Sequence, residues 1–160
     1  MNDLQGISTL KECKIIRMTD SSMKIELRID WSELDAFGHV NNLEIMKYVQ
    51  AARLNYLEKV GLMKLHDDEN KGPILASIHC QFRKPLFYPG QVAVLSKVEY
   101  IKTTSFKIQH EIYNESNEHI AEAQDIIVFY DFTKKHKIAI TTGIKQKIEC
   151  MENSHSDLEY

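Results

Sequence analysis

The chain has 160 residues and a mass of 18.6 kDa, which predicts one domain that can bury a full hydrophobic core. Its composition, 43% hydrophobic and 27% charged, is ordinary for a globular protein, and the net charge of −3 gives no bias toward nucleic acid or anionic membranes. No apolar run approaches the roughly 20 residues of a membrane span, and residues 1–10 lack a secretory signal. We therefore expect a cytoplasmic protein with no nucleic-acid or membrane partner.

The first elements in chain order are an extension and a strand. Residues 1–21 have only a weak pattern and are expected to form an N-terminal extension. From Met23 to Trp31, apolar residues occupy every second position. This alternation predicts a strand with one buried face.

The apolar spacing changes to three and four residues after position 42, which predicts a long helix. Asn41 or Asn42 is the expected N-cap, and Glu44 stands three residues after Asn41, in the spacing of a capping box. Gly61 suits the left-handed residue that ends a helix. At about 18 residues the helix spans roughly 27 Å, enough to cross a whole sheet.

The rest of the chain reads as strands followed by a tail. Four strands are predicted, over 72–82, 91–101, 105–113 and 119–132. Residues 141–160 are expected to be a polar C-terminal tail, either a fraying helix or disordered. The strand–helix–four-strand order predicts an α+β domain over 22–140, with an antiparallel sheet of about five strands packed on one long helix. One helix covers one face only, so we expect a partner subunit on the other face or an open edge.

Familiar sites are absent from the sequence. The three cysteines, Cys13, Cys80 and Cys150, include no C-x-x-C pair, and the seven histidines are scattered. No nucleophile elbow, Walker A loop, dinucleotide-binding turn or H-E-x-x-H pair occurs. We expect no metal and no cofactor.

The stretch WSELDAFGHVNN, 31–42, is richer in polar residues than a strand-to-helix connection requires. One interpretation is structural, with turn formers such as Asp35 and Gly38 and helix caps at Asn41 and Asn42. The other is chemical. Asp35 precedes a helix N-terminus whose free N–H groups, near Asn42 and Leu43, can polarise an acyl carbonyl.

In the chemical interpretation, a carboxylate within reach of that carbonyl attacks it or takes a proton from an attacking water. Gly38 would let the backbone approach a ligand closely. Such a site suits thioesters, because a thiol with a pKa near 8.5 leaves with little acid catalysis.

These residues resemble a known family. RIDWSELDAFGHVNNLEIMKYVQAARLNYLEKVGL is similar to the hot-dog-fold thioesterases, specifically the 4-hydroxybenzoyl-CoA thioesterase-like and short acyl-CoA thioesterase branch. That family has a D-x-D-x-x-G-x-V-N/H-N loop, and the helix that follows carries a second motif, which ends in A-R. The matching positions, within a resemblance over about 22–133, are Glu33, Asp35, Gly38, His39, Val40, Asn41, Asn42, Met46, Val49, Ala52 and Arg53.

The resemblance implies an acyl-CoA thioesterase with a hot-dog fold, Asp35 as nucleophile or general base, and the Asn42 backbone N–H as the group that polarises the carbonyl. It also implies a homodimer or homotetramer with the acyl site between protomers, and coenzyme A present only as part of the substrate. Further candidate substrate-binding residues are Gly38, His39, Val40, Asn41, Arg83 and Lys84.

Glu33 departs from the family's first Asp and is interpreted as an acceptor that orders the loop. Met46 stands where the family often has Tyr, which implies a differently shaped acyl pocket. His39 and Asn41 have structural alternatives as loop and cap residues. Arg53 is expected in a structural ion pair or a contact with a carbonyl. Arg83 and Lys84 are either phosphate contacts or a solvated strand end. The alternatives are an acyl-carrier-protein thioesterase on the same fold, a non-catalytic acyl-CoA-binding protein and, less favoured, a dehydratase.

Overall fold

The computed structural model describes residues 23–153, so the expected extension over 1–21 and Cys13 lie outside the described residues. The elements in chain order are β1 (Met23–Arg28), the 3-10 helix η1 (Trp31–Glu33), α1 (Asn42–Val60), α2 (Leu62–Glu69), β2 (Lys71–Phe82), β3 (Gln91–Ile101), β4 (Ser105–Asn114), β5 (His119–Asp131), β6 (His136–Lys137) and α3 (Thr142–Asn153).

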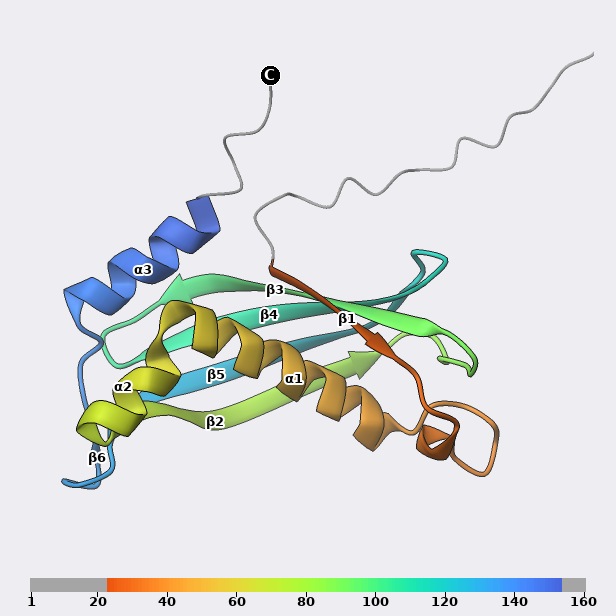
Figure 1. The fold of residues 1–160 in the computed structure, drawn as a ribbon, viewed down its shortest axis with the longest axis horizontal. Helices are drawn as coiled ribbons and strands as arrows, with labels where there is room; N and C mark the ends of the chain where they lie inside the picture. The colour runs from red at the N-terminus through yellow and green to blue at the C-terminus, as the bar shows by residue number, and fades with distance from the viewer. Residues whose placement is uncertain (1–22, 154–160) are drawn as a thin grey trace, which may run out of the picture.

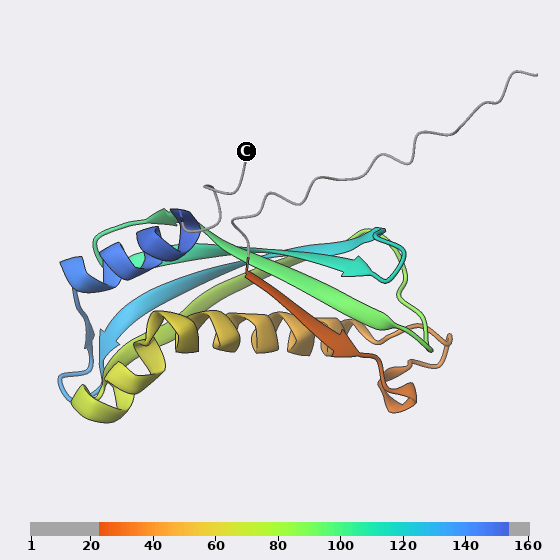
Figure 2. The same ribbon diagram turned by 45° about the horizontal axis from the view of Figure 1, so that its top comes forward.

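Five long strands form one antiparallel sheet in the order β1-β3-β4-β5-β2, with the two-residue β6 paired to β5. The sheet curves around α1, which lies along its concave face (Figures 1 and 2). This confirms the predicted α+β architecture of one long helix wrapped by about five strands.

The ends of α1 are set by local chemistry. The Oδ1 atom of the N-cap Asn41 accepts the Leu43 N–H at 2.9 Å, and Gly61, at φ 84°, ends the helix in the left-handed conformation. Asn41, rather than Asn42, is therefore the cap. The capping box predicted with Glu44 is not formed: the Asn41 N–H donates to the Glu33 carbonyl at 2.8 Å, and Glu44 pairs with Lys47 at 2.7 Å.

The core consists of two clusters, one along each half of α1. The half near the helix N-terminus includes Ile45, Tyr48, Val49 and Ala52 with strand residues such as Ile112. The other half includes Tyr56, Leu57, Val60 and residues of α2, α3 and the sheet, such as Phe106 and Ile148. Between them, the Arg53 guanidinium pairs with buried Asp125 at 2.7 Å, which confirms the predicted ion pair.

Two short helices stand outside the predicted strand–helix–strand order. Residues 62–69 form α2, which buries only Leu62, so the acidic stretch HDDE (66–69) lies on a helix. Residues 142–153, expected as a fraying helix or as disorder within the tail over 141–160, form the helix α3. Its Ile144 and Ile148 are buried, and Glu152 accepts hydrogen bonds from the Tyr56 hydroxyl at 2.5 Å and the Val98 N–H at 2.8 Å. Figure 2 shows α3 beside the C-terminal half of α1.

The strand β2 ends the sheet and has an irregular register. Its pairing to β5 shifts between Leu75 and Ser77, so one extra residue is accommodated there. Leu75, Ile78 and Phe82 all pair with buried β5 residues, yet they remain 39%, 37% and 47% exposed. The sheet therefore has an apolar, uncovered edge.

Candidate active site

The polar stretch between β1 and α1 is a closed loop. The Asp30 side chain caps η1 by accepting the Ser32 N–H at 2.9 Å, and the Glu33 side chain returns to the Asp30 N–H at 2.9 Å. Leu34 and Val40 then form a bridge across the loop. Trp31, expected on the buried face of the first strand, is 70% exposed, because the strand ends at Arg28 and η1 redirects the chain.

Backbone hydrogen bonds hold this loop against the connection between β2 and β3. The Val40 N–H donates to the Leu86 carbonyl at 2.8 Å, and the Ile29 N–H donates to the Gly90 carbonyl at 3.1 Å. The His39 ring meets the Phe87 ring edge-on, with centroids 5.1 Å apart. Residues more than forty positions apart in sequence are thus in contact.

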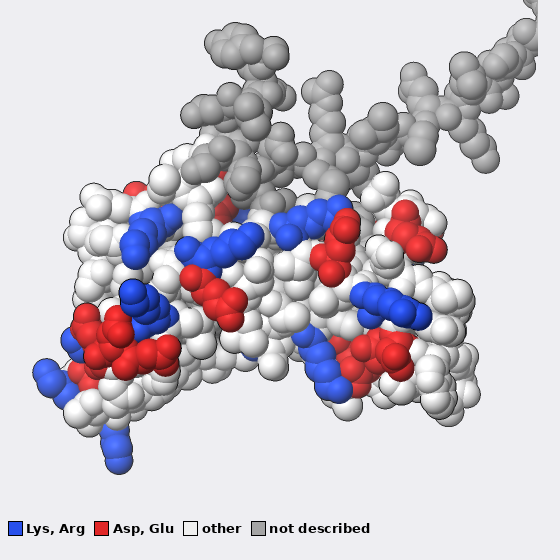
Figure 3. Space-filling view, viewed as in Figure 1, with Lys and Arg blue, Asp and Glu red and all other residues white. Residues whose placement is uncertain are grey.

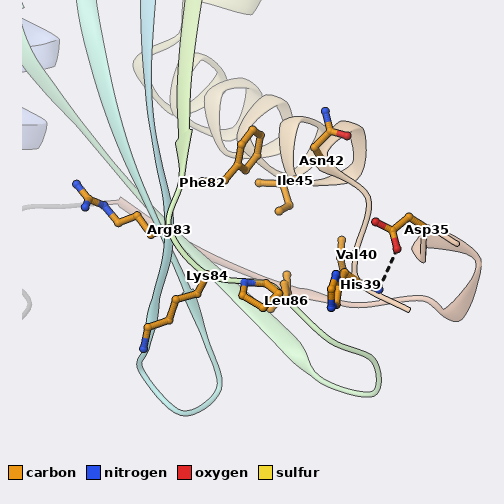
Figure 4. A pocket seen from close by; sticks show the side chains of 10 residues that line it. Asp35, His39, Val40, Asn42, Ile45, Phe82, Arg83, Lys84 and Leu86 are labelled. Carbon is orange, nitrogen blue, oxygen red and sulfur yellow. Dashed lines mark hydrogen bonds between the residues drawn. The ribbon is translucent and has the colours of Figure 1, made fainter. Parts of the chain in front are cut away.

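The Asp35 carboxylate is oriented by its own loop. Its Oδ1 atom accepts the Phe37 N–H at 2.8 Å and the His39 N–H at 3.1 Å, the second of which is drawn in Figure 4. Among the described residues, no donor contacts Oδ2. The backbone bonds from the Asp35 N–H to the His39 carbonyl at 2.7 Å and from the Gly38 N–H to the Asp35 carbonyl at 3.1 Å complete the turn. One oxygen is therefore fixed and the other is available to a ligand.

The N-terminus of α1 presents one free N–H group. The Leu43 N–H is bound by the Asn41 side chain, and the Glu44 and Ile45 N–H groups contact the Asn41 carbonyl at 2.9 and 3.2 Å. Within residues 23–153, the Asn42 N–H has no acceptor. The sequence predicts free N–H groups near both Asn42 and Leu43. Only the Asn42 N–H of the two is free among the described residues, and it lies at the positive end of the helix dipole.

Asp35 and Asn42 border one pocket of about 320 Å³. Figure 4 shows its lining, in which Ile45 and Phe82 extend toward the same space. The lining residues are Asp35, His39, Val40, Asn42, Ile45, Phe82, Arg83, Lys84, Pro85 and Leu86. The pocket therefore combines a carboxylate, a free backbone donor and apolar walls, a combination that can bind an acyl group and polarise its carbonyl.

The predicted site residues divide into two groups. His39, Val40, Arg83 and Lys84 lie on the pocket wall together with Asp35 and Asn42. Gly38 and Asn41 do not: Gly38, at φ 79°, makes the turn, and Asn41 caps α1. A Cβ at Gly38 would meet no protein atom of the described residues within 4 Å, and the positive φ is what favours glycine there.

Arg83 and Lys84 are already paired at the pocket rim. Arg83 contacts Glu122 and Lys84 contacts Glu118, each at 2.8 Å, and both side chains extend away from Asp35 in Figure 4. Hydrogen bonds from Lys84 and Asn114 hold the pKa of the Glu118 carboxyl below its usual value. On the face shown in Figure 3, basic and acidic side chains are interspersed and form no extended patch of one sign.

Tyr48 belongs to the site region but is not among the predicted site residues. It is buried on α1, three positions after Ile45, and its hydroxyl donates to Glu33 Oε2. The signal for its burial is the spacing from Ile45 to Tyr48 and Ala52, which belongs to the helix face toward the core. The role expected for Glu33, an acceptor that orders the loop, is confirmed by this contact and by the Asp30 N–H.

Two further properties concern the described residues only. None of the helices within 23–153 combines the length and the apolar character that crossing a bilayer requires. No group of three His, Cys, Asp or Glu side chains in that range is arranged to hold a metal ion.

Sequence comparisons find similarity to thioesterases. The profile of the thioesterase-like superfamily matches residues 29–148. The chain is 29% identical over 127 residues to the chloroplastic acyl-acyl carrier protein thioesterase ATL3 of Arabidopsis thaliana, a match that covers 78% of this chain and 66% of that protein. It is 21% identical over 130 residues to the long-chain acyl-CoA thioesterase FadM of Escherichia coli, covering 81% of this chain and 98% of FadM.

Structural comparison agrees with the sequence. A thioesterase from Thermus thermophilus, solved in complex with coenzyme A and Zn, superposes with a TM-score of 0.74 at 18% identity, covering 85% of this chain and 97% of that one. This likeness concerns the fold, whereas the profile match covers well over half of the sequence. The chain therefore belongs to the thioesterase-like superfamily and has its hot-dog fold.

Proposed function

We propose that this protein hydrolyses acyl-CoA thioesters to coenzyme A and a carboxylic acid. The observation that carries the proposal is that the Asp35 carboxylate and Asn42, whose N–H has no acceptor among the described residues, border the same pocket. Asp35 acts as nucleophile or as general base, and the Asn42 N–H binds the carbonyl oxygen.

In the reaction, the thioester carbonyl oxygen accepts a hydrogen bond from the Asn42 N–H. Negative charge develops on that oxygen as the carbonyl carbon is attacked, and the hydrogen bond stabilises it. With Asp35 as base, Oδ2 takes a proton from the attacking water and the tetrahedral intermediate expels the thiolate, which is then protonated. With Asp35 as nucleophile, Oδ2 itself forms an anhydride and expels the thiolate, and water then cleaves the anhydride. In both routes Oδ1 stays fixed by Phe37 and His39.

The walls of the pocket suit an acyl-CoA. Val40, Ile45, Phe82 and Leu86 provide apolar surface for the acyl group. We assign Arg83 and Lys84, which line the rim, to the coenzyme A phosphates. Exchanging their glutamate partners for phosphates costs little, because exposed ion pairs are worth less than about 1 kcal/mol. Two similar proteins support this choice of substrate. FadM is named as a long-chain acyl-CoA thioesterase, and the Thermus thermophilus thioesterase was solved in complex with coenzyme A.

A homodimer, alone or paired into a tetramer, is part of this proposal. The β2 edge leaves backbone groups unpaired and presents the half-exposed Leu75, Ile78 and Phe82. Phe82 also lines the pocket, so a second copy on this edge would close the site from outside. Packing β2 against β2 of the partner would bury this apolar surface.

The test is release of free thiol from a panel of acyl-CoA substrates by the wild-type protein and by Asp35→Asn. The asparagine oxygen still accepts the Phe37 and His39 N–H groups, so we expect an unchanged fold and thermal midpoint. We expect kcat to fall by at least about 100-fold, since the group that attacks or deprotonates is removed. An Asp35→Asn protein with wild-type turnover would refute the mechanism. Tight acyl-CoA binding without thiol release would indicate a binding protein instead.

A second candidate function is hydrolysis of acyl groups carried on acyl carrier protein, because the similar plant protein is named as an acyl-acyl carrier protein thioesterase. Turnover of one acyl group on coenzyme A and on carrier protein separates the two. We expect coenzyme A to be preferred, because Arg83 and Lys84 can exchange their exposed glutamate partners for the few phosphates of coenzyme A, whereas two such side chains offer little basic surface to an acidic carrier protein.

A further inference from the structure

A buried tyrosine on α1 is joined to the loop that carries Asp35. Tyr48 is 4% exposed, and its hydroxyl donates to Glu33 Oε2. Burial and the neighbouring carboxylate raise the pKa of the Tyr48 phenol above its ordinary value, so the hydroxyl remains a donor at neutral pH. Tyr48 does not line the pocket, and therefore it does not meet the substrate directly.

Glu33 receives more than this one bond. Its side-chain Oε2 atom also accepts the Asp30 N–H at 2.9 Å, and its backbone carbonyl accepts the Asn41 N–H at 2.8 Å. Glu33 thus contacts the start of the loop, the helix and the residue just before Asn42. The Tyr48 hydroxyl is the contact that ties this assembly to the interior of α1.

The two groups of the proposed reaction lie on either side of Glu33. Asp35 follows it by two residues, and Asn42 follows Asn41, whose N–H is bound to the Glu33 carbonyl. A movement of Glu33 therefore changes the separation between the Asp35 carboxylate and the Asn42 N–H. Misplacement of a catalytic group by about 1 Å costs roughly 100-fold in rate.

We propose that Tyr48 and Glu33 form a positioning pair that sets the Asp35 carboxylate opposite the Asn42 N–H. This inference rests on the proposed thioester hydrolysis and names residues that act on it without touching the substrate. Loss of the pair lowers kcat and leaves KM nearly unchanged, because the pocket walls stay in place.

The chain provides a matched control on the same helix. Tyr56, two turns further along α1, is also buried and also donates to a carboxylate, that of Glu152 on α3, at 2.5 Å. It lies in the other core cluster, away from the pocket. Tyr48→Phe and Tyr56→Phe each remove one hydroxyl and one bond to a glutamate, so their effects on stability are comparable.

The experiment measures kcat and KM of both variants with one acyl-CoA. We expect Tyr48→Phe to lower kcat roughly 10- to 100-fold and Tyr56→Phe to leave it unchanged. At Glu33, Gln keeps an oxygen that accepts from Tyr48 and Asp30, so Glu33→Gln should retain most of the turnover that Glu33→Ala loses. Equal kcat values for the two tyrosine variants in an active enzyme would overturn the positioning role while the proposed function stands.

A second measurement needs no activity. The Asn41 amide is protected from hydrogen exchange by its bond to the Glu33 carbonyl. We expect its protection in Tyr48→Phe to fall by about tenfold relative to Tyr56→Phe. Unchanged protection would refute the positioning pair. If the wild-type protein releases no thiol, the proposed function fails and this exchange measurement alone decides on the pair.

Discussion

Replacing Arg53 by Met should destabilise the protein strongly, because it leaves a buried carboxylate without its main partner. Asp125 is fully buried, and its Oδ2 atom lies 2.7 Å from Arg53 Nη1 and 3.1 Å from His110 Nε2. The Oδ1 atom has no hydrogen-bond partner among the described residues. His110 is in turn bonded to Ser96 at 2.7 Å, so β3, β4, β5 and α1 meet in this one network.

Removing one partner of a buried pair costs about 3–5 kcal/mol. Set against a total of about 5–15 kcal/mol for a typical domain, this is a large fraction of the stability. At about 2–4 °C for each kcal/mol in a chain of this size, the thermal midpoint should fall by roughly 10 °C. The Asp125→Leu change added to Arg53→Met should recover part of the loss, because it removes the buried charge.

The assay is urea denaturation followed by far-ultraviolet circular dichroism. The single tryptophan, Trp31, is 70% exposed and is a poor reporter of unfolding by fluorescence. Arg83→Met is the matched control, since its pair with Glu122 is also short, at 2.8 Å, but its side chain is 44% exposed. We expect this control to cost less than about 1 kcal/mol. Equal losses for Arg53→Met and Arg83→Met would refute the argument from burial.

Two other predictions concern alkaline pH and assembly. Burial and carboxylate partners raise the pKa values of Tyr48 and Tyr56, and burial with Glu111 raises the pKa of Tyr113 to about 12. The folded state holds the proton of such a phenol more tightly than the unfolded state, whose pKa is about 10. Its contribution to the free energy of unfolding is therefore complete below about pH 10 and is lost as the pH rises above that value. The urea midpoint should fall above about pH 10. A midpoint independent of pH across that range would contradict this. Ile78→Asp on the β2 edge should separate the proposed dimer, as seen by light scattering, and reduce thioesterase activity with it; an intact dimer would exclude that edge as the interface.

The sequence predicts the sheet and α1 well because their side chains alternate, or recur, between core and solvent. The burial pattern of β4 alternates along the strand, as the pattern from Phe106 to Ile112 indicates. The helix α2 is not predicted, and α3 is predicted only as one of two alternatives, a fraying helix or disorder. Each buries few side chains, Leu62 in one and Ile144 with Ile148 in the other, so its helical period is weak. Their helical state depends on docking against the end of the core.

The loop residues of the candidate site can be predicted from the sequence, but the hydrogen bonds that hold them in place are harder to predict. Asp35, Asn41 and Asn42 are recognisable because a carboxylate and helix caps stand at fixed spacing. Two facts are not visible in the sequence: that Asn41 consumes the Leu43 N–H, and that Glu33 is reached from Tyr48, fifteen residues later. Both depend on which donor meets which acceptor after the chain has folded.

The bonds that hold the loop over 29–41 to residues 86–90 join main-chain atoms, from Val40 to Leu86 and from Ile29 to Gly90. Main-chain bonds do not depend on which side chains the two segments carry, apart from proline at a donor position. The two segments therefore form a unit that can be transplanted. Homologous segments exchanged together between relatives should keep these main-chain bonds, and the bond to Tyr48 is kept where the incoming loop carries an acceptor at position 33.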